Sequence, residues 1–514
     1  MIKNKDIILA LISGALLVPA FPPFDYYLCA WVALVPLLLA LRNKNHGAAF
    51  LTGFITGLVY FLGTVYWVSH SMYYYGYLPV IICVLVLLLL CSALSVYTGI
   101  FSVLFSSIQG KTRVPALIVV PVLWVSLEYA RTYVLTGLPW SSLGYSQYKL
   151  LPLIQISDIT GIYGVSFLVA ALSGAIFDVI AYRSDKAGEV HLNRWPLTLY
   201  IAIYAVVLVG VVIYGSVKLQ GKAGGQKIKV SLVQGNIEQD KKWDIKFRRE
   251  VIDKYKKLTT KSLEASPDII IWPETAVPFV FDYDKKLTEE IVLFQKELGT
   301  ALLFGSITAK NSKPGNTEMS NSAILLSPRE DAPLIYDKIH MVPYGEYVPL
   351  RNYFPFITRL AGGIGDFLPG KEIVVMETPF AKIGNVICYE IIFPGLVRKF
   401  VDRGANVLVT ITNDAWFGHT SAPYQHFSMA VFRAIENRVP VARAANTGIS
   451  GFIDSRGRIL DTSDIFVEAV MNGEITAGDE KSFYTKYGDI FVYLCLISAV
   501  LLIAGRWFSS KKID

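Results

Sequence analysis

The segment Gly384–Pro394, GNVICYEIIFP, combines a β-strand pattern with a candidate nucleophile. Its apolar run is typical of a buried strand, and Cys388 stands inside that run with Tyr389 and Glu390 directly after it. An unpaired cysteine is usually a small apolar residue of the core. Whether Cys388 is instead a nucleophile depends on the residues that the rest of the chain brings to it.

Strand-like runs lie throughout residues 216–486, and the segment Gly384–Pro394 contains one of them. They are IKVSLVQGNI, DIIIWPE, ALLFGSIT, NSAILLS, NVICYEI, NVLVTITND and ISGFID. Helical stretches alternate with them at Lys246–Ala265, Lys286–Leu298 and Tyr424–Asn437. Strands that alternate with helices indicate α/β or α+β layers, and this segment is long enough for a core of its own.

The rest of the chain is dominated by apolar windows. Of its 514 residues, 53% are hydrophobic and only 17% are charged, whereas soluble proteins carry about a quarter of charged residues. A helix needs about 20 apolar residues to cross a bilayer. Eight windows reach or approach that length: Ile7–Phe21, Tyr26–Leu41, Ala48–Val68, Leu78–Phe105, Val114–Tyr129, Gly161–Tyr182, Trp195–Gly215 and Tyr487–Phe508. The first two are short, so a re-entrant hairpin around PAFPPF is the alternative to two spans.

Lysine and arginine in the loops predict the orientation of these spans. With the N-terminus in the cytoplasm, the outer loops FPPFD and SHSMYYYGY carry neither residue, and only Arg131 and Lys149 stand in the longer outer loop. The inner segments carry Lys3, Lys5, Arg42, Lys44, Lys111, Arg113, Arg183, Lys186, Arg194, Arg506, Lys511 and Lys512. This follows the positive-inside rule and predicts that residues 216–486 lie outside the cytoplasm.

The same basic loops account for the net charge of +7 without a nucleic-acid partner. Lys3 and Lys5 before an apolar run also fit a signal peptide, but no A-x-A site follows, which favours an uncleaved anchor. The five cysteines form no C-x-x-C pair and the six histidines no H-E-x-x-H spacing. We therefore expect neither a disulfide framework nor a metal site.

Three of the strand-like runs lead to groups that catalysis uses. IIIWPETAVP supplies Glu274, LIYDKIHMVPYGEYVP supplies Lys338 and Glu346, and NVICYE supplies Cys388. A cysteine reacts as the thiolate, a carboxylate can take the thiol proton, and an ammonium can stabilise an oxyanion. Each residue also has an ordinary explanation: a helix N-terminal carboxylate for Glu274, a solvated side chain for Lys338 and a simple ion pair for Glu346. The pattern alone does not show that these residues converge.

Four ordered motifs resemble the nitrilase superfamily, whose members use a Glu–Lys–Cys triad. They are W-P-E-T (Trp272–Thr275), Y-D-K-x-H-x-V-P-Y-G-E-Y-V-P (Tyr336–Pro349), C-Y-E (Cys388–Glu390) and T-N-D-A-W-F-G (Thr412–Gly418). Together with the spans, with TGLPWSSLGYSQ (Thr136–Gln147) and with Pro423–Ser450, the whole chain resembles the bacterial apolipoprotein N-acyltransferases.

The resemblance implies a polytopic α-helical membrane domain of about eight spans and an extracytoplasmic nitrilase-like αββα sandwich domain. Residues 1–215 would hold the first seven spans, 216–486 the catalytic domain, and 487–514 the eighth span and a cytoplasmic tail. We expect a multi-pass monomer without a cofactor in the bacterial cytoplasmic (inner) membrane, with its catalytic domain on the periplasmic face.

The implied reaction moves a fatty acyl chain from a phospholipid to the α-amino group of the diacylglyceryl-cysteine of an apolipoprotein, through a cysteine thioester. By motif, Glu274 would be the general base, Lys338 the oxyanion stabiliser and Cys388 the nucleophile. Supporting roles would fall to Glu346, Tyr389 and Glu390, and substrate contacts to Trp243 and Trp416.

Two other functions compete with this one. In a membrane-tethered nitrilase-like amidase, water would resolve the thioester, and in a scaffold the domain would be degenerate. The intact residues Glu274, Lys338 and Cys388 weigh against the scaffold, and the spans weigh against the hydrolase. Few ionisable residues lie within the spans (Glu128, Asp178), which argues against an ion-coupled transporter.

We expect His419 and His426 to be structural. The aromatic residues of Val59–Tyr77 are expected to form an aromatic belt, with a lipid-entry surface as the alternative.

Overall fold

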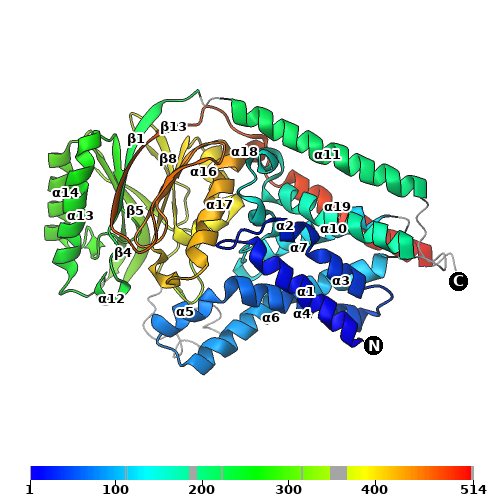
Figure 1. Ribbon diagram of the computed structural model, residues 1–514. Helices are drawn as coiled ribbons and strands as arrows, with labels where there is room; N and C mark the ends of the chain where they lie inside the picture. The colour runs from blue at the N-terminus through cyan, green and yellow to red at the C-terminus, as the bar shows by residue number, and fades with distance from the viewer. Residues whose placement is uncertain are drawn as a thin grey trace. The chain divides into compact units, whose positions relative to one another are not determined.

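The computed structural model describes residues 2–109, 112, 114–184, 194–221, 224–242, 244–313, 316–330, 332–347 and 367–510. The chain forms two compact units (Figure 1). The first, here called the membrane unit, contains Met1–Tyr73, Leu78–Gly221 and Tyr487–Asp514. The second, the catalytic unit, contains Lys222–Lys486 and the short segment Tyr74–Tyr77.

Each of the eight apolar windows contains helix. Five helices are long and apolar enough to cross a membrane by length and composition: His46–Val65, Val80–Ile108, Ala116–Thr136, Ile162–Ser184 and Pro196–Gln220. Two apolar helices are shorter, Leu28–Ala40 and Ile490–Arg506. The number of eight spans stays a prediction.

The main helices of the membrane unit are α1 (Asn4–Leu17), α2 (Leu28–Val32), α3 (Leu34–Ala40), α4 (His46–Val65), α5 (Trp67–Tyr74), α6 (Val80–Ile108), α7 (Ala116–Tyr133), α8 (Leu151–Ile154), α9 (Ser157–Thr160), α10 (Ile162–Ser184), α11 (Arg194–Gln220) and α19 (Ile490–Ser510).

Small residues allow α4 and α6 to pack closely. Gly53 and Gly57 are four residues apart on α4, and both face α6. A Cβ atom at Gly53 would collide with Ser102 Oγ, and one at Gly57 would lie 2.9 Å from Ser95 Cα. Small residues at this spacing bring helix backbones together in membranes, where lipid offers no hydrophobic gain for association.

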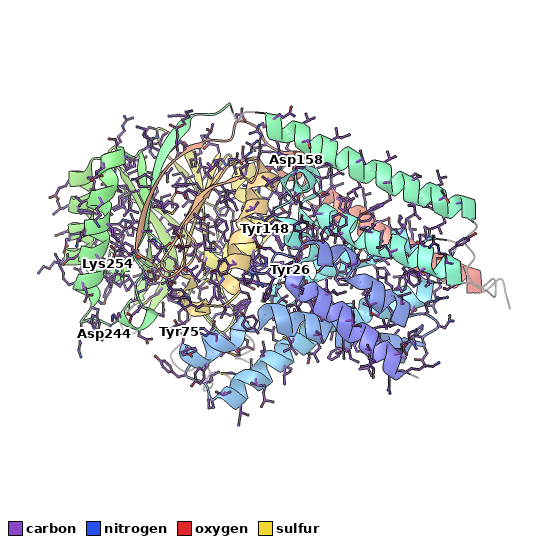
Figure 2. The ribbon with its side chains drawn as sticks, viewed as in Figure 1. Tyr26, Tyr75, Tyr148, Asp158, Asp244 and Lys254 are labelled. Carbon is purple, nitrogen blue, oxygen red and sulfur yellow. The ribbon has the colours of Figure 1, made fainter. Side chains whose placement is uncertain are left out.

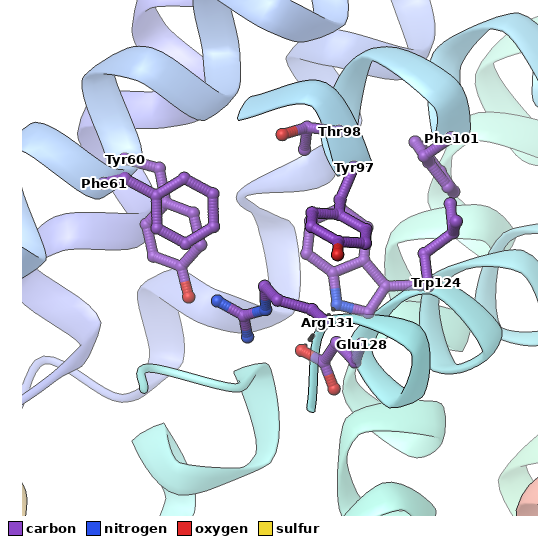
Figure 3. A pocket seen from close by; sticks show the side chains of 9 residues that line it. Tyr60, Phe61, Tyr97, Thr98, Phe101, Trp124, Glu128 and Arg131 are labelled. Atoms are coloured by element: carbon purple, nitrogen blue, oxygen red, sulfur yellow. Dashed lines mark hydrogen bonds between the residues drawn. The ribbon is translucent and has the colours of Figure 1, made fainter. Parts of the chain in front are cut away.

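Asp178 and Glu128, acidic residues of the predicted spans, have structural partners. Asp178 accepts hydrogen bonds from the N–H groups of Ala116 (3.0 Å) and Leu117 (2.9 Å), the first residues of α7. Glu128 accepts from Trp124 Nε1 at 2.9 Å and from the N–H of Leu143 at 2.6 Å. Figure 3 shows Glu128 beside Arg131 and several aromatic side chains, around a cavity of about 30 Å³. That volume suits one or two water molecules rather than a lipid.

Two sheets form the centre of the catalytic unit. The first has the strand order β13-β1-β2-β4-β5-β6, with β3 beside β4, and the second has the order β12-β11-β10-β9-β8-β7. The first sheet contains β1 (Lys227–Gln234), β2 (Ile269–Ile271), β3 (Val280–Phe281), β4 (Ala301–Lys313), β5 (Asn316–Leu326), β6 (Leu334–Asp337) and β13 (Ala469–Thr476). The second contains β7 (Val375–Glu377), β8 (Lys382–Ile387), β9 (Val407–Thr412), β10 (Val441–Ala445), β11 (Gly451–Ile453) and β12 (Ile459–Thr462).

Helices cover the outer face of each sheet, which gives the predicted αββα layers (Figure 1). One outer layer holds α13 (Arg248–Ser262) and α14 (Lys285–Leu298), and the other holds α16 (Pro394–Asp402) and α17 (Ala422–Asn437). The packing follows from amphipathic spacing. Val251, Ile252, Tyr255 and Leu258 lie on one face of α13 and are buried in the core with Trp272.

Parallel pairing aligns the ends of strands that carry polar residues. In the second sheet β8 pairs parallel with β9, and β9 with β10. In the first sheet β1, β2 and β4 are parallel neighbours. Parallel strands end at a common edge. The residues that follow β2, β8, β9 and β10 are Trp272, Cys388, Asn413 and Asn446, and contacts given below join these four segments.

Candidate active site

Cys388 stands at a sharp turn from strand to helix. Strand β8 ends at Ile387, and Cys388 opens the short 3₁₀-helix η5 (Cys388–Ile392) with φ +52°. The prediction that the strand continues through Cys388 to Ile391 is therefore wrong. A left-handed conformation is costly for a residue with a Cβ, and it persists where the surroundings determine it. The apolar pattern missed the turn because Ile391 and Ile392 are as buried in the 3₁₀-helix as they would be in a strand.

Glu274 lies in a turn after β2, where no helix begins, so the helix N-terminal explanation does not apply. Its Oε1 accepts from Asn321 Nδ2 at 2.8 Å, and its Oε2 accepts from the N–H of Asn413 at 2.9 Å. Gly305 on β4 makes room for this turn. A Cβ at that position would lie 2.6 Å from Glu274 Cα and still closer to the nitrogen of Thr275.

Lys338 is 1% exposed and lies between two carboxylates, so it is not the solvated side chain of the ordinary explanation. Its Nζ is 2.9 Å from Glu346 Oε1 and 3.7 Å from Glu274 Oε1. Burial opposes the charge, but Glu346 and Glu274 together hold the pKa of Lys338 above its usual value. The lysine is therefore an ammonium ion at neutral pH.

The thiol of Cys388 is protonated at rest. Burial raises its pKa above the usual value, and the charge of Glu274 raises it further, while Lys338 lowers it. Such a thiol reacts when a neighbouring group takes its proton, and Glu274 is a charged neighbour that can accept one. The structure thus brings Glu274, Lys338 and Cys388 into one buried cluster.

Glu346 joins the same cluster. Its Oε1 accepts from Lys338 Nζ and, at 2.9 Å, from Asn321 Nδ2, and its Oε2 accepts from the N–H of Val342 at 2.8 Å. Three donors thus fix both oxygens of this carboxylate.

Glu390 connects the lysine segment to the cysteine segment. It is fully buried, and its Oε1 accepts from Tyr336 Oη (2.8 Å) and from the N–H groups of Ile339 (2.7 Å) and His340 (3.0 Å). Its Oε2 accepts from the N–H of Ile387 at 2.8 Å. Burial raises the pKa of Glu390, although the backbone donors and Lys338 counter that rise. Tyr389 points elsewhere, with its ring against Phe393 at 5.1 Å between centroids.

A buried Asp–His–Arg group, which we did not predict as functional, supports the main chain of Cys388. His426 Nε2 lies 3.2 Å from the Cys388 carbonyl oxygen, and its Nδ1 faces Asp414 Oδ1 (3.1 Å) and Arg443 Nη2 (3.0 Å). Burial and the charge of Arg443 lower the pKa of His426, so the imidazole is neutral at pH 7. These buried contacts are those of a structural residue, as expected for His426.

Asn321 is a second residue that we did not single out. Its Nδ2 donates to both Glu274 and Glu346, and its main-chain carbonyl oxygen accepts from the N–H of Lys338 at 2.8 Å. One signal was available in the sequence. Asparagine is depleted in strands, yet this one opens the apolar run NSAILLS.

The two predicted tryptophans are less informative. Trp416, on the 3₁₀-helix η6 (Asp414–Phe417), is 40% exposed, and its ring packs edge-on against Tyr75 at 5.1 Å between centroids. Tyr75 is labelled in Figure 2, and it belongs to the segment Tyr74–Tyr77 of the catalytic unit. Trp243 lies outside the described residues. Substrate contacts of both tryptophans stay predictions.

Among the described residues, no group of three or more His, Cys, Asp or Glu is arranged to hold a metal ion.

Comparisons with known proteins match both halves of the chain. The family model of the apolipoprotein N-acyltransferase N-terminal domain matches residues 13–175, and that of the carbon-nitrogen hydrolases matches residues 229–484. A protein of Geobacter metallireducens named apolipoprotein N-acyltransferase is 45% identical over 514 residues, which cover 100% of this chain and 97% of that protein. One of Pasteurella multocida with the same name is 31% identical, over 98% of this chain and 95% of that protein.

A solved carbon-nitrogen hydrolase structure from Helicobacter pylori aligns at 14% identity with a TM-score of 0.38, over 49% of this chain and 90% of that chain. The identity to the curated relatives extends over nearly the full length of both chains. The carbon-nitrogen hydrolase match falls within the catalytic unit. The N-terminal-domain match falls in the apolar N-terminal part of the chain. The chain therefore belongs to the apolipoprotein N-acyltransferase family and is an acyltransferase that carries a carbon-nitrogen hydrolase domain.

Proposed function

We propose that this acyltransferase moves a fatty acyl group from a membrane phospholipid to the α-amino group of the diacylglyceryl-cysteine of apolipoproteins, which yields triacylated lipoprotein. The observation that carries the proposal is the buried cluster of Glu274, Lys338 and Cys388 in a chain whose other half consists of apolar helices. The names of its relatives supply the apolipoprotein acceptor and the transfer of an acyl group to nitrogen, and the phospholipid donor is part of the proposal. Both substrates are held in the membrane by their lipid chains, so the reaction requires an active site that they can reach from the bilayer.

In the first half-reaction, Glu274 takes the proton of the Cys388 thiol, and the thiolate attacks the ester carbonyl of the phospholipid. The ammonium of Lys338 and the N–H of Tyr389 stabilise the resulting oxyanion. The intermediate collapses as the ester C–O bond breaks, and Glu274 returns the proton to the leaving oxygen. The products are a thioester on Cys388 and a lysophospholipid.

In the second half-reaction, the α-amine of the apolipoprotein attacks the thioester carbonyl. Glu274 accepts the amine proton, the same donors stabilise the second oxyanion, and the C–S bond breaks. The proton then returns to Cys388. A covalent intermediate lets two large lipid substrates use one site in turn, so the kinetics are ping-pong.

The remaining residues have supporting roles in this scheme. Glu346 holds the ammonium of Lys338 in place, and Glu390 fixes the lysine segment against the strand that leads to Cys388. Trp243 and Trp416 contact the acyl chains. We place the catalytic unit on the periplasmic face of the inner membrane, in an eight-span monomer, because lysine and arginine are concentrated in the alternate loops.

The test uses the full-length protein in detergent with phospholipid and a diacylated lipopeptide, and mass spectrometry of both products and of the enzyme. We expect an acyl adduct on Cys388 before lipopeptide is added, and N-acylated lipopeptide afterwards. Cys388→Ala should abolish the adduct, Glu274→Gln should block its formation, and Cys83→Ala, a control in α6, should change neither. Free fatty acid without N-acylated lipopeptide would instead indicate the hydrolase, and an adduct on the Cys388→Ala variant would disprove the assigned nucleophile.

A further inference from the structure

A second lysine, Lys242, is buried next to Glu274. It is the last residue of the short helix α12 (Gln239–Lys242), and its side chain has no exposed surface. Its Nζ donates to the main-chain oxygen of Glu274 at 2.8 Å. Neither the motifs nor the reaction scheme above uses this residue. A buried lysine needs an explanation, because lysine is almost never fully buried unless it is paired.

Helix α12 is attached to Glu274 at two points. Besides the bond from Lys242, Gln239 Oε1 accepts from Asn413 Nδ2 at 2.7 Å. The N–H of the same Asn413 holds Glu274 Oε2, and Asn446 Nδ2 donates to Asn413 Oδ1 at 3.0 Å. The helix therefore contacts the main chain of Glu274 directly and its carboxylate through Asn413.

The charges of the cluster do not balance without Lys242. The ammonium of Lys338 is 2.9 Å from Glu346 and 3.7 Å from Glu274, so one cation faces two carboxylates. An uncompensated buried charge is costly, and two carboxyl groups that share one site tend to retain a proton. A retained proton on Glu274 would prevent it from accepting the proton of Cys388.

Lys242 can supply the missing charge. The titratable groups that act on it are Glu274 and Cys388, whereas Asp240 and Lys241 on its own helix are exposed. Burial lowers the pKa of Lys242 to about 7, although Glu274 and Cys388 favour the charged form. The positive charge is thus present below about pH 7 and is lost above it.

We propose that Lys242 is a positioning residue that supplies the second positive charge of the active site and keeps Glu274 ionised for the proton transfer from Cys388. Its bond to the Glu274 carbonyl oxygen fixes the charge in place. The inference rests on the proposed function, in which Glu274 is the base and Cys388 the nucleophile. A lysine that only anchors α12 would support the same fold without affecting the protonation of Glu274.

The experiment measures the alkylation rate of Cys388 by iodoacetamide from pH 5.5 to 9 in the full-length protein, with peptide mass spectrometry to resolve Cys388 from the other cysteines. We expect Lys242→Met to react about tenfold more slowly than wild type at pH 6, the effect of one pKa unit, and at nearly the wild-type rate at pH 8.5. Lys242→Arg should keep the wild-type rate at pH 6. Lys241→Met, the exposed neighbour, is the matched control and should follow wild type throughout.

A second variant separates charge from anchoring. Lys242→Gln retains a hydrogen-bond donor for the Glu274 carbonyl oxygen, and we expect it to lose rate at pH 6 as Lys242→Met does. An equal loss at every pH in both variants would reduce Lys242 to an anchor of α12, and no loss would remove it from the site. A wild-type Cys388 that reacts no faster than Cys83 would instead refute the proposed nucleophile, which is a different outcome.

Discussion

A single amide, that of Asn321, donates to both carboxylates of the site. Both of its N–H bonds are used, one toward Glu274 and one toward Glu346. An amide nitrogen can only donate, so each of these bonds ends on a carboxylate oxygen that accepts it. Asn321 and Lys338 therefore act on the same pair of carboxylates, one through hydrogen bonds and the other mainly through charge.

We predict that Asn321→Asp strongly slows acylation of Cys388. The substitution keeps the shape of the side chain, removes both donors and adds a third carboxyl group, so a proton is retained in the cluster. Hydrogen bonds to charged groups are worth about 1.5–3 kcal/mol each, so a loss of about 10- to 100-fold in the first half-reaction is expected. Single-turnover measurement of the acyl adduct checks this. Asn472→Asp makes the same change at an exposed position of β13 and should leave the rate unaltered.

At the scale of elements, strand β4 supports the turn that carries Glu274. The N–H of Gly305 donates to the carbonyl oxygen of Pro273 at 3.1 Å, and the N–H of Val277 donates to the carbonyl oxygen of Gly305 at 3.2 Å. These bonds are possible because position 305 has no side chain between the strand and the turn.

We predict that Gly305→Ala lowers activity well before it unfolds the protein. The new Cβ would overlap the main chain of Glu274 and Thr275, neither of which is a flexible side chain, so the turn has to move. A displacement of about 1 Å at a catalytic group can cost about 10²-fold in rate. Acylation kinetics and thermal unfolding measured together test this. Gly47→Ala, where nothing lies within 4 Å of an added Cβ, should behave as wild type, and equal activity in both variants would contradict the prediction.

Most regular elements of the catalytic unit could be predicted from hydrophobic pattern. The runs around Ile269–Ile271 and Val407–Thr412 are strands, and the helix predicted at Tyr424–Asn437 is α17. The edge strand β12 was missed because all of its residues, Ile459–Thr462, are exposed, so the strand has no alternation of buried and exposed residues. Cys388 was misplaced because a left-handed turn leaves no trace in hydropathy.

The site could be predicted only where a motif names its residues. Glu274, Lys338 and Cys388 each follow or interrupt an apolar run, and the structure brings them together. Lys242 donates to the main-chain oxygen of Glu274, and the main-chain N–H of Asn413 donates to the Glu274 carboxylate. Bonds that use a main-chain group require no particular spacing in the sequence. The sequence around Lys242 also looks like a surface segment, because its polar neighbours, such as Lys241, are exposed. Nothing in that sequence distinguishes a buried lysine from an exposed one.

At the scale of the whole molecule, the catalytic unit includes residues from a distant part of the chain. The segment Tyr74–Tyr77 begins at the last residue of α5, yet Tyr75 packs against Trp416 and Tyr77 Oη lies 3.4 Å from Asp240 Oδ1 on α12. These contacts connect the tyrosine segment to two elements that also carry site residues. The aromatic belt expected for Val59–Tyr77 stays a prediction.

We predict that Trp416→Ala releases this segment. Aromatic pairs are worth about 0.5–1.5 kcal/mol beyond their burial, so the local stability of residues 74–77 should fall by about 1 kcal/mol. Hydrogen exchange of the full-length protein should show faster exchange there, and the double variant with Tyr75→Ala should exchange no faster than Trp416→Ala alone. Tyr283→Ala, at an exposed tyrosine of the same unit, is the control. Unchanged exchange in Trp416→Ala would mean that other contacts hold the segment.

The pairing of the first and last strands of the catalytic unit has a consequence for how the chain is made. β1 ends at Gln234, its antiparallel partner β13 begins at Ala469, and the two are in register along all eight residues of each strand. At about 5–20 residues per second, a ribosome needs roughly 10–50 s to produce the second strand after the first. During that interval one edge of β1 presents unpaired N–H and C=O groups, the arrangement that invites pairing with another chain. A nascent chain of this protein can therefore complete its first sheet only after β13 has been synthesised.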